Sequence, residues 1–301
     1  MNRTTHPRPS SPGLRPSTLI ADSGSTKTDW ALVAPDGTVS LLHTQGINPV
    51  HQDEQTITAI LTSELLPQIA PQIADAPITA IYFYGSGVRP SEEPLMQRLL
   101  QSSLNPQQST LNIEAHNDLL GAARALCGRS EGLACILGTG ANSCLFDGHQ
   151  IIANTPPLGY ILGDEGSGAV LGIRLLNALY KGLLPDAVRH EFEDEHGMTL
   201  GDIISRVYRQ PMANRFLASL SPFVHAHLHL QAVNDMVVDN FRLFLQHNVR
   251  PYGRPDLPLF AVGSIAHYYK KQLSEAITSE GYTLGRIERS PLNLLIEYHK
   301  Q

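Results

Sequence analysis

The stretch "LIADSGSTKTDWALV", residues 19–33, contains two apolar runs separated by a short polar turn. Two apolar runs around Gly, Ser and Thr are typical of a β-hairpin, so we expect strand, turn and strand here. Small side chains in the turn would let backbone N–H groups approach a ligand closely, and an anion is the usual guest of such a turn. An ordinary hairpin has the same composition, so other parts of the chain must decide between these two interpretations.

A second stretch, "LACILGTGANSCLFDGHQI", repeats the order of strand, glycine-bearing turn and strand. Gly24 and Gly140 hold corresponding places in the two stretches, and Asp36-Gly37 and Asp147-Gly148 both mark the turn that follows. The repetition predicts two halves of similar plan.

Length and composition restrict the function classes. At 301 residues the chain exceeds one comfortable hydrophobic core, so we expect about two domains. The net charge is −6 and the 22 basic residues are scattered, which argues against a nucleic-acid partner. No stretch approaches the ~20 apolar residues that span a bilayer, so we expect a soluble protein with no membrane partner. The three cysteines lack CxxC spacing, which fits a reducing cytoplasm.

Strands and helices alternate along the chain, which predicts an α/β fold. Residues 1–18 are rich in proline and arginine, and we expect them to form a disordered extension. Helical patterns cover residues 53–73, 92–103, 118–127, the tail of the stretch 154–184 from Ser167 onward, 185–248, 265–281 and the end from residue 291, with strands between several of them. One buried strand ends in Gly85-Ser86-Gly87, and another leads into Gly263-Ser264.

The glycine turns suggest a phosphate site. Gly24 and Gly140 lie in hairpin turns without bulky side chains, and Gly263 lies at the start of a helix. Together these elements could bind a triphosphate through backbone N–H donors and the helix dipole. The chain contains no GxxxxGK[ST] and no GxGxxG before a helix, which excludes the P-loop and the Rossmann turn as the source of that site.

Acidic residues stand beside these turns. Asp22 ends the first strand and is either a Mg²⁺ ligand or an Asx-turn residue. Asp118 lies between a strand and a helix, where a helix cap is the alternative role. Asp164 and Glu165 in "GDEGSG" are either cap residues or face a ligand.

Two aromatic or histidine clusters do not predict a site. His225 and His229 would share a helix face while His227 points away, so the three do not form a metal site on a helix. Tyr268 and Tyr269 are expected to be packing residues rather than an adenine shelf.

The ordered motifs resemble the N-acetylglucosamine kinase branch of the sugar kinase, Hsp70 and actin superfamily, grouped with the BadF/BadG/BcrA/BcrD ATPase family. The resemblance covers nearly everything after residue 18 and is carried by "DSGSTKTDW", "HNDLLGAARAL", "LGTGANS", "GYILGDEGSG" and "VGSIA". It implies an α/β protein with two RNase H-like (actin-like ATPase) domains around a nucleotide-binding cleft. The first domain would comprise residues 19–128 with 290–301, and the second residues 129–289.

The resemblance also implies a role for each matching residue. Asp22 would hold Mg²⁺, and Asp118 would be the catalytic base that accepts the proton of the sugar hydroxyl. Residues implied in nucleotide binding are Ser23, Gly24, Ser25, Thr26, Thr139, Gly140, Gly263 and Ser264. Residues implied in substrate binding are Asn48, Asp118, Ala141, Asn142, Leu158, Gly159 and Asp164.

The function implied is ATP- and Mg²⁺-dependent phosphorylation of the 6-hydroxyl of an amino sugar, with N-acetylglucosamine as the first candidate and a homodimer as one candidate assembly. Pro156-Pro157-Leu158-Gly159 stands where the family often has Gly-Gly-Trp-Gly, which bears on the identity of the sugar. Gly263-Ser264 replaces Gly-Gly, which bears on the tightness of nucleotide contact. Two alternatives stay open: a BadF-type ATPase activator of a dehydratase, which needs cluster-binding cysteines, and a non-catalytic sugar and ATP sensor.

Overall fold

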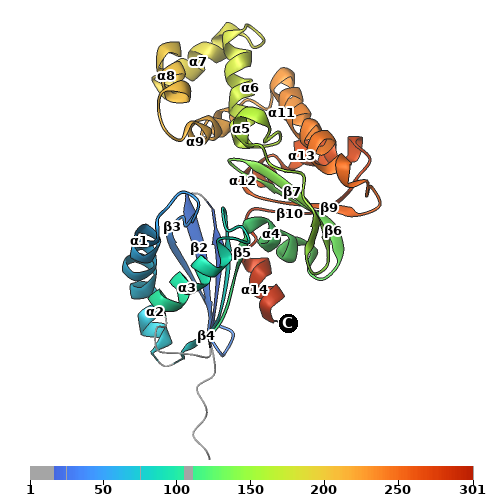
Figure 1. Cartoon of the computed structure of the whole chain (residues 1–301). Coiled ribbons are helices and arrows are strands. Elements are labelled where there is room, and N and C mark those ends of the chain that lie inside the picture. Colours follow the sequence, from blue (N-terminus) through green and yellow to red (C-terminus); the bar gives the residue numbers. More distant parts are fainter. Residues whose placement is uncertain (1–16, 25, 75, 105–110, 301) are drawn as a thin grey trace, which may run out of the picture. The chain divides into compact units, whose positions relative to one another are not determined.

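The structure is a computed structural model that describes residues 17–24, 26–74, 76–104 and 111–300 (Figure 1). The chain divides into two compact units. The first unit comprises the described residues up to Asp118 together with Leu295–Lys300, and the second unit comprises Leu119–Leu294. Each unit is built on a five-stranded mixed sheet, so the predicted α/β fold class with two actin-like ATPase units is confirmed.

The sheet of the first unit positions the opening hairpin. Its strands are β1 (Ser17–Ser23), β2 (Lys27–Val33), β3 (Val39–Gln45), β4 (Ile78–Gly85) and β5 (Asn112–Asn117), in the order β3-β2-β1-β4-β5. β1 runs antiparallel to β2, as predicted, and parallel to β4, which is parallel to β5. Because parallel strands end at the same edge of a sheet, the residues that follow β1, β4 and β5 lie side by side.

Helices complete the first unit. They are α1 (Glu54–Ala59), the π-helix η1 (Ile60–Leu65), α2 (Leu66–Ile73), α3 (Glu93–Leu104) and the end of α14 (Leu292–Lys300). Asp53 caps α1 by accepting from the Thr56 N–H at 2.8 Å, and the helical stretch predicted for residues 53–73 is present with a π-turn in its middle. The chain's end is tied to the sheet, because the His299 ring stacks on Tyr82 with 3.6 Å between centroids.

The sheet of the second unit repeats the plan of the first. Its strands are β6 (Glu131–Leu137), β7 (Ala141–Asp147), β8 (Ile151–Ala153), β9 (Pro258–Val262) and β10 (Thr283–Glu288), in the order β10-β9-β6-β7-β8. In both sheets the first strand lies in the centre, between an antiparallel hairpin and two parallel strands. The two halves of similar plan predicted from the glycine turns are confirmed.

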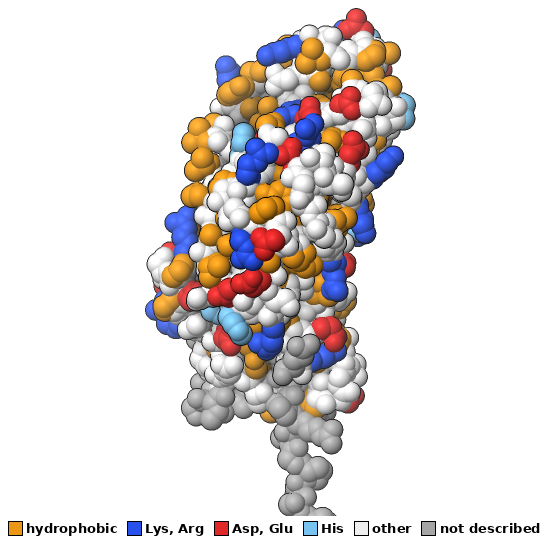
Figure 2. Space-filling model, turned by 90° about the vertical axis from the view of Figure 1, so that its right-hand side faces the viewer, with side chains coloured by type: hydrophobic (Ala, Val, Ile, Leu, Met, Phe, Trp, Pro, Cys, Tyr) orange, Lys and Arg blue, Asp and Glu red, His pale blue; other side chains and the backbone are white. Residues whose placement is uncertain are grey.

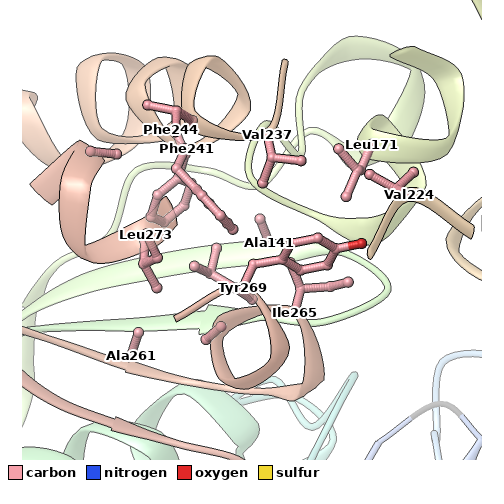
Figure 3. Close-up of a cluster of buried hydrophobic side chains, with 14 of the residues drawn as sticks. Ala141, Leu171, Val224, Val237, Phe241, Phe244, Ala261, Ile265, Tyr269 and Leu273 are labelled. Atoms are coloured by element: carbon pink, nitrogen blue, oxygen red, sulfur yellow. The ribbon is translucent and has the colours of Figure 1, made fainter. Parts of the chain in front are cut away.

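The second unit has more helices and a larger core. The helical elements are α4 (Asp118–Cys127), α5 (Gly159–Leu162), α6 (Gly168–Tyr180), α7 (Asp186–His196), α8 (Leu200–Tyr208), α9 (Ala213–Ala218), α10 (Ser221–Ala226), α11 (Gln231–Phe244), η2 (Leu245–Val249), η3 (Arg250–Tyr252), α12 (Ser264–Tyr268) and α13 (Lys270–Ser279). Figure 3 shows how α11 and α13 bring Phe241, Phe244 and Leu273 over the sheet, next to Ala261 of β9. These side chains are fully buried, so α11 and α13 are anchored on the sheet that carries the second glycine turn.

Three predicted boundaries are corrected. The end of the chain rejoins the first unit at Leu295 rather than at residue 290. Ser17 and Thr18 are not part of an extension, because they belong to β1 and the Ser17 hydroxyl donates to the Ala76 carbonyl at 2.9 Å. Residues 1–16 lie outside the described residues. The structure also divides the chain earlier than the predicted boundary at 128/129. The reason is that α4 buries Leu119 and Leu126 in a cluster with side chains of β7 and β9, so this helix packs with the second unit.

Two surface properties bear on partners. Acidic and basic side chains are interspersed over the face drawn in Figure 2, without an extended basic region among its described residues. None of the helices in the described part of the chain combines the length and apolar character needed to cross a membrane.

Candidate active site

The end of the first sheet brings two predicted functional carboxylates together. The register pairs Ser23 with Gly85 and Gly85 with Asn117, so Asp22 near the end of β1 and Asp118 directly after β5 lie at the same edge of the sheet, with β4 between their strands. The pKa of Asp22 is raised to about 7, first by burial and then by the negative charges of Asp118 and Asp29. The predicted metal ligand and the predicted base are therefore close enough to repel each other.

Asp22 fits a cation site better than a turn. It is a strand residue paired with Asp29 and Tyr84, and no hydrogen bond from another described residue reaches its carboxylate. The described residues contain no group of three His, Cys, Asp or Glu side chains placed to hold one metal ion. One carboxylate supplemented by water and substrate phosphates is the usual arrangement for Mg²⁺, so the residues present fit that ion.

The turn of the first hairpin is small and exposed. The Gly24 N–H donates to the Lys27 carbonyl at 3.0 Å, so this glycine contributes space rather than a donor. Thr26 is exposed, and its carbonyl accepts from the Gly46 N–H at 3.1 Å. Ser25 lies outside the described residues. A phosphate group would therefore meet the bare surface of Gly24 and the side chain of Thr26.

Ser23, predicted in nucleotide binding, turns its side chain inward. It is 0 % exposed, and its Oγ lies 2.7 Å from Thr28 Oγ1 and 3.0 Å from both the N and O atoms of Ile47. Side chains of a strand alternate between its two faces, and Ser23 is on the face opposite to that of Asp22. The hydroxyl of Ser23 thus holds protein segments together rather than facing solvent.

Asn48 is held by one hydrogen bond to its side chain and one from its backbone. Its Oδ1 accepts from the Val50 N–H at 3.0 Å, and its backbone N–H donates to Gln52 Oε1 at 2.8 Å. Its Nδ2 has no hydrogen-bond partner among the described residues. The Nδ2 group of this largely buried residue is therefore available to donate to a sugar hydroxyl or acetyl oxygen.

The second glycine turn is supported by a helix. The N–H groups of Gly168 and Ala169 donate to the carbonyls of Gly138 and Thr139 at 2.8 and 3.2 Å. Ser167 caps α6 as predicted, because its Oγ accepts from the Val170 N–H at 3.2 Å. The first N–H groups of α6 therefore hold the turn in place and do not point at a ligand.

Asp164 is in contact with this turn. Its backbone has a φ of +56°, and its carboxylate accepts a hydrogen bond from the Ala141 N–H. A Cβ on Gly140 would lie 3.1 Å from Asp164 Oδ2, so the missing side chain permits this approach. Burial raises the pKa of Asp164. Since Ser167 is the cap of α6, the cap alternative for Asp164 is wrong, and Glu165 instead pairs with His247 at 3.0 Å.

Asn142 is oriented by a residue that the sequence motifs did not identify. Its Oδ1 accepts from Asn154 Nδ2 at 2.9 Å and from the Ser143 N–H at 2.9 Å. Asn154 thereby connects β7 to the loop that carries Leu158, which is 60 % exposed, and Gly159, which has a φ of +77°. Asn142 is thus held by the residue that begins the segment leading to Leu158 and Gly159. Asn154 lies two residues before Pro156-Pro157, and local sequence gives no sign that its side chain reaches β7.

Gly263 is a structural necessity as well as a candidate nucleotide residue. Its φ is +125°, and a Cβ would lie 2.2 Å from the Leu137 carbonyl oxygen, directly before the second glycine turn. Ser264, the first residue of α12, is exposed beside it. The third glycine therefore places the start of α12 against the second turn.

We expect Gly263→Ala to destabilise the protein, because the new Cβ collides with backbone and because non-glycine residues are strained at this φ, by about 1–3 kcal/mol for the strain alone. Thermal unfolding measures the effect. Gly253→Ala is the control, since its φ of +66° is also positive but nothing lies within 4 Å of its Cβ. Equal melting temperatures for the two variants would contradict the close contact with Leu137.

The solved structures place the chain among known proteins. No family profile and no curated protein sequence matches it. A candidate N-acetylglucosamine kinase from Porphyromonas gingivalis is 51% identical, with a TM-score of 0.89 over 94% of this chain and 98% of that one. The chain belongs to this N-acetylglucosamine kinase-like family. The fold is shared with a candidate N-acetylglucosamine kinase from Chromobacterium violaceum, at 18% identity, a TM-score of 0.71 and coverage of 94% and 98%.

A more distant relative carries ligands. A ROK family glucokinase from Streptomyces griseus, solved with glucose and AMPPNP, has 13% identity and a TM-score of 0.52, and the match covers 94% of this chain and 98% of that chain. At this identity the likeness shows the fold alone. The predicted assignment to N-acetylglucosamine kinase-like proteins is confirmed by the first of these structures.

In this kinase-like chain the cysteines do not fit the activator alternative. Cys127, Cys135 and Cys144 are all free and buried. Burial raises the pKa of Cys127 and of Cys144 to about 12, so neither thiol is prepared to ligate iron as a thiolate. An iron–sulfur cluster needs accessible thiolate ligands, and these three positions do not supply them.

His227 and Tyr269 have packing roles, whereas the prediction that Tyr268 is a packing residue is wrong, because half of its surface is exposed. His227 is buried, stacks on Phe223 and lies 2.9 Å from the Phe223 carbonyl through its Nδ1. Tyr269 is 1 % exposed and its hydroxyl donates to the Ser221 carbonyl. Tyr268 is 51 % exposed, with the Arg289 guanidinium 5.7 Å from its ring centroid.

Proposed function

We propose that this protein is an ATP-dependent sugar kinase that transfers the γ-phosphate to the 6-hydroxyl of an amino sugar, with N-acetylglucosamine as the preferred substrate. The observation that carries the proposal is that Asp22 and Asp118 lie at the same edge of the first sheet, beside the turn at Gly24, which has no side chain. Membership of the N-acetylglucosamine kinase-like family agrees with it.

The residues of each unit divide the chemistry between them. Phosphoryl transfer passes through a loose transition state, so positioning and charge neutralisation supply most of the catalysis. Asp22 would hold Mg²⁺, which neutralises charge on the phosphate oxygens when bound. Asp118 would accept the proton of the attacking hydroxyl, and Asn48 would donate to the sugar through its Nδ2. In the second unit, Asp164 and Asn142 would contact the sugar and the turn at Thr139 and Gly140 the phosphates.

A sugar-dependent ADP assay tests the proposal. N-acetylglucosamine, glucosamine, N-acetylmuramic acid and glucose are offered with Mg²⁺ and ATP, and ADP release and the phosphorylated product are measured. We expect the highest kcat/KM with N-acetylglucosamine and phosphate on its 6-hydroxyl. Binding of sugar and ATP without any ADP release would favour the sensor alternative, and release of ADP without a sugar product would refute the kinase.

We expect Gly24→Ala to raise the KM for ATP roughly tenfold, equivalent to about 1.4 kcal/mol, with little change in the KM for the sugar. A Cβ there would lie 3.7 Å from the Lys27 carbonyl, an ordinary contact, so the free protein accommodates it. It would nevertheless cover the surface that a phosphate approaches. Initial rates measure both constants. Gly201→Ala is the control, with a Cβ 3.6 Å from Thr199 Oγ1, and an unchanged KM for ATP in Gly24→Ala would remove Gly24 from the nucleotide site.

Four further features are part of the proposal and rest on sequence: membership of the BadF/BadG/BcrA/BcrD group, closure of two domains over a nucleotide-binding cleft, a cytoplasmic location, and a homodimer. The free and buried cysteines agree with a reducing compartment. Analytical ultracentrifugation of the full chain tests the dimer.

A further inference from the structure

One buried serine joins three loops at the active edge of the first sheet. Ser23 stands between Asp22 and Gly24, the predicted metal and phosphate residues. Its Oγ accepts from the Ile47 N–H at 3.0 Å, and Ile47 is itself 0 % exposed. Its carbonyl accepts from the Ser86 N–H at 2.8 Å. The phosphate hairpin is thereby bonded both to the sugar loop, defined here as residues 46–52, and to the loop that follows β4.

The loop that follows β4 also touches the sugar loop. Gly87 has a φ of +79°, and a Cβ on it would lie 2.2 Å from Asn48 Oδ1 and 3.0 Å from Asn48 Nδ2. The missing side chain lets this loop lie directly against the amide that is expected to bind the sugar. The hairpin, the sugar loop and the loop after β4 therefore form a closed set of contacts around Asn48.

We propose that Ser23 and Gly87 are positioning residues that couple nucleotide binding at the hairpin to sugar binding at Asn48. The inference rests on the proposed function. Phosphates and metal that bind at Asp22 and Gly24 order the hairpin and, with it, Ser23. Because the Ser23 Oγ is bonded to Ile47, the backbone of Ile47 and Asn48 is ordered as well. The sugar then binds a loop whose ordering has been completed. By linkage, the sugar strengthens nucleotide binding by the same factor.

The experiment compares the wild-type protein with Ser23→Ala, Gly87→Ala and Gly37→Ala. Gly37 is the matched control, because its φ of +89° carries the same strain for alanine while nothing lies within 4 Å of its Cβ. Calorimetry gives the Kd for N-acetylglucosamine with and without Mg²⁺ and AMPPNP. We expect the analogue to tighten sugar binding by about fivefold or more in the wild type and in Gly37→Ala. In Ser23→Ala and Gly87→Ala the factor should fall below about twofold.

Hydrogen exchange over residues 45–50 supplies a second readout. The analogue should slow exchange in the wild type and in Gly37→Ala but not in the two positioning variants. A purely structural role for Ser23 would speed exchange equally with and without the analogue, and would overturn the inference. If Ser23→Ala does not fold, Gly87→Ala decides alone, because its new Cβ displaces the loop after β4, which is bonded to the Ser23 carbonyl through Ser86, from its contact with Asn48.

The failures are distinguishable. A wild type that phosphorylates sugar but binds it equally well with and without the analogue overturns the coupling and leaves the kinase intact. Positioning variants with wild-type coupling do the same. A wild type that neither binds nor phosphorylates any sugar overturns the proposed function and this inference together.

Discussion

Asp118→Asn is expected to lower kcat by about 10²–10⁴-fold, the usual contribution of general-base catalysis. Asparagine keeps the shape of the side chain but cannot accept the proton that the sugar hydroxyl loses. Its amide still hydrogen-bonds the hydroxyl, so the Kd for the sugar should change little. Asp118 begins α4, and Asp and Asn cap helices almost equally well, so the melting temperature should be close to that of the wild type. ADP release, calorimetry and thermal unfolding measure these three quantities.

Asp118→Asn is also expected to change the pH dependence of the activity. The charge of Asp118 raises the pKa of Asp22, so its removal should lower that pKa and move the acid limb of the activity profile to lower pH. Asp202→Asn is the control, because Asp202 also lies at the start of a helix, where its Oδ2 accepts from the Thr199 N–H at 2.9 Å, and is far in sequence from every predicted substrate residue. Wild-type kcat in Asp118→Asn would reduce Asp118 to a helix cap and restore the sensor alternative.

Asp22→Asn is expected to abolish turnover and yet to stabilise the free protein. The folded-state pKa of Asp22 is raised from 3.8 to about 7, so the folded protein binds more protons than the unfolded chain between these values. Stability is therefore lost as the pH rises from about 4 to 7, and the loss is complete above about pH 8. It amounts to about 4 kcal/mol as an order of magnitude at 1.36 kcal/mol per pKa unit. The asparagine variant escapes this loss because it has no charge to bury.

Thermal unfolding over pH 4–9 without ligand measures the effect. The melting temperature of Asp22→Asn should exceed that of the wild type by roughly 5 °C or more at pH 8, and the gap should narrow toward pH 4. Mg²⁺ with AMPPNP should raise the melting temperature of the wild type and not of the variant, because only the carboxylate holds the cation. Asp36→Asn, in an exposed turn, is the control. If Asp22→Asn melts at a lower temperature than the wild type at pH 8, the buried charge of Asp22 does not destabilise the protein, and its carboxylate has a structural role.

Local sequence determined the elements and their order. The opening hairpin, the second glycine turn and the helix that begins at Asp118 all lie where their residues predict them. Each depends on interactions between near neighbours: small residues in a turn, apolar alternation in a strand, or a polar residue at a helix start. The same local logic placed Asp22 and Asp118 at strand ends, and the shared edge of parallel strands brings them together.

Tertiary packing decided the direction and environment of individual side chains. Ser23 is a residue type typical of a phosphate-binding loop, but its hydroxyl is hydrogen-bonded to Thr28 and Ile47. Helix α4 follows the first sheet in sequence but packs with the second unit through Leu119 and Leu126. The raised pKa of Asp22 arises from burial and from Asp118, which is distant in sequence. Contacts between distant residues depend on how sheets and helices pack, and local spacing carries no information about that.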